Sequence, residues 1–187
     1  MNRRAALLAL GAIGLLILSA CTSASVTVKF DHIHGLGFSA DGSRLLIPAH
    51  DGLKLYVDGK WQVPEQPKHD YMGFAVTDDG FYSSGHPAPG SKLPEPLGLV
   101  KSADGGKTLK MLGLQGQYDF HVMGAGYKNH AVYVFNQVAS PQLPAGLQVS
   151  LDDGKSWKRA GAKGLSGAPI QIAVHPTDPK IVAVGTE

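Results

Sequence analysis

The sequence has a single cysteine, Cys21, among its 187 residues. One cysteine excludes an intrachain disulfide and a zinc site built from several cysteines. There is no run of basic residues, so nothing indicates a nucleic-acid partner. Aromatic residues make up only 7% of the chain, and tryptophan or tyrosine suited to stacking on a sugar is scarce. Long helical periodicity is absent as well.

Glycine and proline, in contrast, are abundant, with 24 and 12 copies. Without helical periodicity, this composition favours many short strands joined by tight turns. The sequence therefore predicts an all-β fold.

The N-terminus predicts export. A basic start, MNRR, precedes an apolar stretch of 16 residues from Ala5 to Ala20. That stretch is shorter than the roughly 20 residues of a spanning helix and reads as a secretory signal. Removing residues 1–20 leaves 15 basic and 15 acidic residues, so the mature chain is formally neutral and its charge suggests no acidic or basic partner.

The segment LSAC, from Leu18 to Cys21, resembles the lipobox of bacterial lipoproteins, in which the signal is cut before the cysteine and the cysteine carries the lipid. The resemblance predicts a signal peptide over 1–20, and a lipidated Cys21 with a short linker over 21–29. The protein would then be anchored to the outer surface of the bacterial cytoplasmic membrane or to the outer membrane. The alternative is an ordinary cleaved signal with an incidental cysteine.

Two segments repeat one pattern, LGLVKSADGGKTLKML at 97–112 and AGLQVSLDDGKSWKRA at 145–160. A weaker copy, GLKLYVDGKWQV, occupies 52–63. Equivalent aspartates, Asp104 and Asp152, are 48 residues apart, and Asp58 precedes Asp104 by 46. Periods of this size are typical of the four-stranded blades of a β-propeller.

The pattern resembles the Asp-box, or BNR, repeat of bacterial sialidases and sortilin-like propellers, Ser-x-Asp-x-Gly-x-Thr-Trp. Aspartate can accept hydrogen bonds from nearby backbone amides and glycine supplies positive φ, so the pattern suits a hairpin turn. We expect a structural and not a catalytic role for its residues: Ser102, Asp104, Gly106, Ser150, Asp152, Gly154 and Trp157.

The repeat divides residues 30–187 into a partial β-propeller with about three and a half blades. The predicted blades cover 30–66, 71–113 and 119–160, and an incomplete fourth covers 168–187. A closed ring needs four to eight blades. Either the chain is truncated, which we favour, or another copy completes the ring.

The blade frame places polar residues from separate segments on one face. In a propeller, the loops that enter the first strand of each blade share a face with the loops that leave the second strand. DHIHGLGF (31–38), HDYMGF (69–74) and YDFHVMG (118–124) open first strands, whereas IPAHDG (47–52) and SSGHPAP (83–89) end second strands. The predicted face carries His32, His34, His50, Asp70, His86, Asp119 and His121.

Such a face predicts a site for a metal ion or a small ligand. Imidazole and carboxylate groups together suit zinc, copper, iron or nickel, and outside the cytoplasm zinc and copper are the plausible ions. Hydrogen bonding to a polar ligand, acid–base chemistry and simple satisfaction of strand-end amides remain open. The other histidines, His69, His130 and His175, are predicted to point elsewhere or to lie on the opposite face.

Two alternative functions are a glycoside hydrolase and a protein-interaction platform. Some exported BNR-repeat proteins with similar HIHGL, MGF, SGHP and DFH segments are labelled glycosyl hydrolases. A glycosidase needs two carboxylates, and Asp70 and Asp119 are the candidates for the acid and base because both fall on the predicted face. The arginine cluster of sialidases is absent, since Arg44 and Arg159 are the only arginines left after the signal, so sialidase activity is not supported. A protein-interaction or assembly platform is the third reading.

Overall fold

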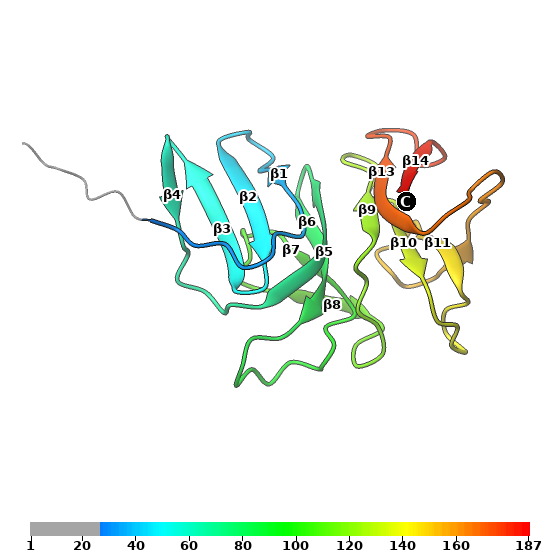
Figure 1. Cartoon of the computed structure of the whole chain (residues 1–187), viewed down its shortest axis with the longest axis horizontal. Coiled ribbons are helices and arrows are strands. Elements are labelled where there is room, and N and C mark those ends of the chain that lie inside the picture. The colour runs from blue at the N-terminus through cyan, green and yellow to red at the C-terminus, as the bar shows by residue number, and fades with distance from the viewer. Residues whose placement is uncertain (1–26) are drawn as a thin grey trace, which may run out of the picture.

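The computed structural model describes residues 27–187, and the predicted signal peptide and Cys21 lie outside the described residues. In this part of the chain all regular secondary structure is β, arranged as four antiparallel sheets that follow one another along the sequence (Figure 1). No helix in the described residues is long and apolar enough to span a membrane.

Three sheets have four strands each, in sequence order. The first contains β1 (Gly37–Phe38), β2 (Arg44–Ala49), β3 (Gly52–Val57) and β4 (Lys60–Gln62). The second contains β5 (Asp70–Thr77), β6 (Gly80–His86), β7 (Leu99–Ser102) and β8 (Lys110–Gly113). The third contains β9 (Met123–Ala125), β10 (Val132–Asn136), β11 (Gly146–Ser150) and β12 (Lys158–Arg159).

The fourth sheet has two strands, β13 (Pro169–Val174) and β14 (Val182–Thr186). The first strands of the blades lie next to one another, because β5 contacts β1 and β9, and β9 contacts β13. The sheets therefore stand side by side as blades of a ring that does not close within the described residues (Figure 1).

The apolar core is divided among the spaces between blades. Tyr71 and Phe81 pack with Leu46 between the first and second blades. Tyr82, Phe120 and Val132 belong to the cluster between the second and third blades. A third cluster joins Tyr133, Leu147 and Ile172 across the third and fourth blades. Burial between blades, at about 25 cal/mol per Å² of apolar surface, is therefore what fixes each blade against the next.

Glycine in the first strand allows this close packing. A Cβ on Gly73 of β5 would lie 2.2 Å from the carbonyl oxygen of Phe120, and one on Gly124 of β9 would lie 2.5 Å from that of Ile172. Each blade therefore needs a residue without a side chain where the next blade approaches.

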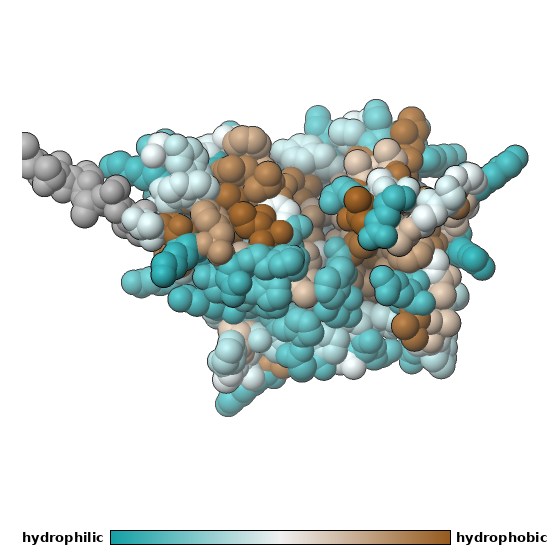
Figure 2. Space-filling model, in the orientation of Figure 1, coloured by the Kyte–Doolittle hydropathy of each residue, from teal (hydrophilic) through white to brown (hydrophobic). Residues whose placement is uncertain are grey.

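The outer faces of the two end blades expose apolar side chains. Leu36 and Phe38 are more than 60% exposed beside the first blade, and Ile170 and Ile181 are both 55% exposed on the fourth. Figure 2 shows apolar surface near both ends of the molecule. These are the faces that an additional blade would cover in a closed ring.

The two Asp-box segments form turns with the same hydrogen bonds. Asp104 accepts from the amide and the hydroxyl of Thr108 at 2.9 and 2.7 Å, and Asp152 accepts from those of Ser156 at 2.9 and 2.6 Å. The buried hydroxyl of Ser150 accepts from the amide of Gly154 at 2.8 Å, as that of Ser102 does from Gly106. The polar atoms of these turns are thus largely satisfied within the turn.

Candidate functional site

The histidines of the first blade meet because two backbone segments pair. The amide of His34 donates to the carbonyl of Pro48 at 3.1 Å, and the amide of His50 donates to that of Asp31 at 3.0 Å. This pairing brings the loop before β1 against the end of β2. His32 has a left-handed backbone, with φ of 43°, a conformation that non-glycine residues adopt mainly where the surroundings impose it.

His32, His34 and His50 form a compact group, called here the tri-histidine cluster. Their ligand-type nitrogens all lie within 4.8 Å of one another. The ring centroids are 4.6 Å apart for His32 and His34, 4.7 Å for His34 and His50, and 5.1 Å for His32 and His50. His32 and His50 are exposed, while the side chain of His34 is only 11% exposed.

Asp70, the first residue of β5, lies beside this cluster from the second blade. Its Oδ2 is 3.2 Å from Nδ1 of His50, and its Oδ1 is 3.9 Å from Nε2 of His34. Oδ1 of Asp70 and Nε2 of His34 are both buried without a hydrogen-bond partner. Because buried polar atoms are normally paired, these two mark a position where a further polar or metallic partner would be stabilising.

A second group adjoins the cluster and is called here the Asp119 group. Asp119 lies just before β9, and its Oδ2 is 3.0 Å from Nε2 of His86 and 3.4 Å from Nδ1 of His121. Nδ1 of His86 contacts Glu95. The two groups are neighbours: the ring centroids of His34 and His121 are 6.4 Å apart.

The electrostatics of the two groups differ. Burial, followed by the nearby His50, lowers the pKa of His34, so its neutral, ligand form is favoured. The hydrogen bond that His86 donates to Glu95 is the main cause that raises the pKa of His86, which favours its charged form. The same face thus holds one imidazole suited to coordination, that of His34, and one suited to pairing with carboxylates, that of His86.

The seven side chains predicted for this face therefore fall into two adjoining groups. The tri-histidine cluster with Asp70 comes from the first and second blades, and the Asp119 group comes from the second and third. Sequence reasoning missed Glu95, because it lies in a long irregular loop before β7 that the repeat pattern does not place.

The remaining histidines lie elsewhere. His69 is buried, and its Nδ1 accepts from the amide of Ala88 at 2.9 Å; burial lowers its pKa. Nδ1 of His175 accepts from the amide of Asp178 at 3.1 Å. Both side chains are accounted for by backbone contacts.

His130 is less incidental than the sequence suggested, because it gathers with two carboxylates. Its Nε2 lies 2.6 Å from Asp78 and 3.6 Å from Asp79, in turns on the same side of the ring as the Asp-boxes. Asp79 is already engaged by Lys101 at 2.7 Å and by Thr77 at 2.8 Å. A cation at this position would have to compete with the ammonium of Lys101, so the tri-histidine cluster is the better candidate.

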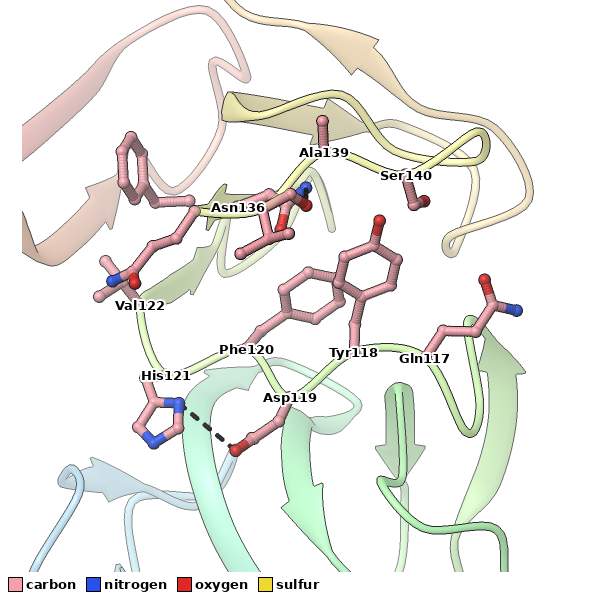
Figure 3. Close-up of a pocket in the computed structure, with 12 residues that line it drawn as sticks. Gln117, Tyr118, Asp119, Phe120, His121, Val122, Asn136, Ala139 and Ser140 are labelled. Atoms are coloured by element: carbon pink, nitrogen blue, oxygen red, sulfur yellow. Dashed lines mark hydrogen bonds and ion pairs between the residues drawn. The ribbon is translucent and has the colours of Figure 1, made fainter.

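A cavity of about 780 Å³ lies between the segment before β9 and the loop after β10. Figure 3 shows Tyr118 and Phe120 pointing toward that loop, whereas Asp119 and His121 point to the other side of the same segment. The rings of Tyr118 and Phe120 are stacked, with centroids 5.3 Å apart. The alternation separates the apolar wall of the cavity from the polar atoms of the histidine face.

No protein-family model matches the sequence. No curated protein matches it significantly either. Among solved structures, the chain is similar to the GH74 xyloglucanase from Xanthomonas campestris, with a TM-score of 0.54 and 18% sequence identity. The match covers 82% of this chain and 27% of the xyloglucanase chain.

At this identity the likeness concerns the fold alone. It confirms the predicted all-β propeller-like fold, whose ring is not closed within the described residues. The Asp-box relationship and the lipoprotein signal stay predictions.

Proposed function

We propose that this protein is an exported, membrane-anchored propeller that binds a transition-metal ion, copper or zinc, at the tri-histidine cluster. The observation that carries the proposal is the approach of three imidazoles whose ligand nitrogens all lie within 4.8 Å of one another. Neutral imidazole is a common ligand for both ions, and neither requires a sulfur ligand.

Burial and exposure at the cluster support binding over simple structural packing. A histidine that only stabilises the fold usually has a hydrogen-bonded ring, as His69 does through Nδ1, yet the buried Nε2 atom of His34 has no partner. His32 and His50 are exposed, so an ion can reach the cluster from solvent and leave it again. This combination suits reversible binding or delivery of the ion outside the cytoplasm.

The proposal is tested by metal titration of the full chain in mild detergent, with Cu²⁺ and Zn²⁺ added separately. We expect one ion to bind tightly, and His34→Ala and His50→Ala each to weaken binding by on the order of 100-fold or more, because each removes a ligand. His175→Asn keeps a side-chain acceptor for the neighbouring amides and is the matched control, with unchanged binding.

The opposite results would contradict the proposal. If neither ion binds, or if both variants bind as tightly as the unaltered chain, the cluster is not a metal site. Retained binding that is lost instead in His130→Ala would move the site to the opposite side of the ring.

A second candidate, hydrolysis of a glycan by Asp70 and Asp119, is favoured by one observation, the likeness in fold to a xyloglucanase. The present chain corresponds to 27% of that protein, and both carboxylates are in contact with histidines. Hydrolysis of xyloglucan that persists with a chelator and disappears in Asp70→Asn would favour this function over metal binding.

A further inference from the structure

The spacing of the rings in the tri-histidine cluster determines how three imidazoles can surround one ion. With the bound nitrogen about 2.0 Å from the ion, the centre of an imidazole ring lies about 3.2 Å from it, so ring centres about 4.5–5.2 Å apart subtend about 90–110° at the ion. The three separations in the cluster, 4.6, 4.7 and 5.1 Å, all fall in this range. Three ligands at such angles lie on one side of the ion and leave its other side free.

Nothing else in the part of the chain that the structure describes completes this ligand set. The group of ligand atoms contains His32, His34 and His50 alone, and Oδ1 of Asp70 stays 3.9 Å from Nε2 of His34. An ion such as zinc that has three protein ligands keeps a further position for water or another donor. Because His32 and His50 are exposed, a dissolved donor can reach that free position.

His32 is the least constrained of the three ligands. The side chain of His34 is only 11% exposed, and backbone hydrogen bonds to Pro48 and Asp31 hold the amides of His34 and His50. His32 is exposed and has a left-handed backbone, with φ of 43°. Its ring is stacked on that of His34, with 28° between the planes. Lone pairs lie in the ring planes, so one ring must turn before both bind the same ion, and the exposed ring of His32 has room to do so.

We infer that the bound ion keeps one coordination position open to solvent and is passed on by direct exchange. The donor group of a recipient enters the open position, and His32 is the first ligand that it displaces. This inference rests on the proposed metal-binding function and specifies how the ion leaves. The recipient is a protein or chelator that presents an imidazole or a thiolate, the groups that bind copper and zinc.

The test uses the full chain in mild detergent, loaded with one equivalent of Cu²⁺. Imidazole labelled with ¹⁵N is added, and pulsed electron paramagnetic resonance distinguishes it from the ¹⁴N imidazoles of the protein. We expect three protein imidazoles before the addition, and a labelled imidazole bound together with protein imidazoles after it. Transfer of copper to free histidine should become faster in proportion to the histidine concentration, because the recipient binds before the ion leaves.

Two variants test the part played by His32. His32→Asn removes the imidazole, and asparagine tolerates the left-handed backbone. It should still bind copper through two imidazoles, more weakly than the unaltered chain, and should transfer the ion faster. His34→Asn should lose more affinity than His32→Asn does. His175→Asn is the control and should keep the spectrum, the affinity and the transfer rate.

The outcomes separate this inference from the function on which it rests. If no copper binds, the metal-binding function itself fails. If copper binds but no labelled imidazole enters, or if the transfer rate does not depend on the histidine concentration, the function stands and direct exchange is wrong. A carboxylate oxygen ligand that disappears in Asp70→Asn would show that the fourth position is already filled. Equal losses of affinity in His32→Asn and His34→Asn would contradict the role of His32.

Discussion

The two faces of the propeller use aspartate in opposite ways. On the Asp-box side, Asp104 and Asp152 accept several hydrogen bonds from their own turns. On the histidine side, Asp70 and Asp119 each have one buried oxygen without a hydrogen-bond partner. A carboxylate that is satisfied locally stabilises a turn, whereas one left partly unpaired beside imidazoles is available to support binding.

The first prediction contrasts a turn residue with a cluster residue in the apoprotein. Ser150→Ala leaves the buried amide of Gly154 without its acceptor and should lower the free energy of unfolding by about 1–3 kcal/mol. His50→Ala changes an exposed side chain and should lower it by no more than about 0.5 kcal/mol. Denaturant titration of both variants checks this difference.

The reverse order would break the comparison between the faces. A large loss in metal-free His50→Ala, with little change in Ser150→Ala, would mean that the histidine side stabilises the fold and that the turns are dispensable. Copper binding should follow the opposite pattern, lost in His50→Ala and retained in Ser150→Ala.

A smaller effect is expected from acid pH on the Asp-box side. Hydrogen bonds from the Ser156 hydroxyl and amide lower the pKa of Asp152 below its ordinary 3.8, and the amide of Thr108 is the main cause for Asp104. A depressed folded-state pKa gives stability that is present above 3.8 and lost as pH falls through the lower, folded value.

Unfolding measured between pH 6 and pH 2 checks this dependence. The loss of stability toward pH 2 should be shallower in Asp152→Asn than in the unaltered chain, because one of the linked carboxylates is gone. An identical slope in both proteins would show that the turn does not hold the ionised form of Asp152.

Much of the histidine face could be predicted from sequence, because the repeat fixes the blade frame. The Asp-boxes mark the turn between the third and fourth strands of a blade. His34 and His50 then fall at the strand ends on the other face of the propeller, and Asp70 falls beside them. The prediction needed only strand direction, which the repeat supplies.

Other contacts could not be predicted, because they depend on loop conformation and ring orientation. Glu95 reaches His86 from an irregular loop, and His130 meets Asp78 across blades through turns on the other side. Nothing in a sequence shows that His50 and His121 both turn Nδ1 toward a carboxylate.

The most direct test of the central claim is an anomalous diffraction map from crystals of the protein grown with Cu²⁺. Metal binding at the tri-histidine cluster predicts one strong peak about 2.0–2.1 Å from ring nitrogens of His32, His34 and His50. No peak there, or a peak only beside Asp78, Asp79 and His130, would contradict the claim.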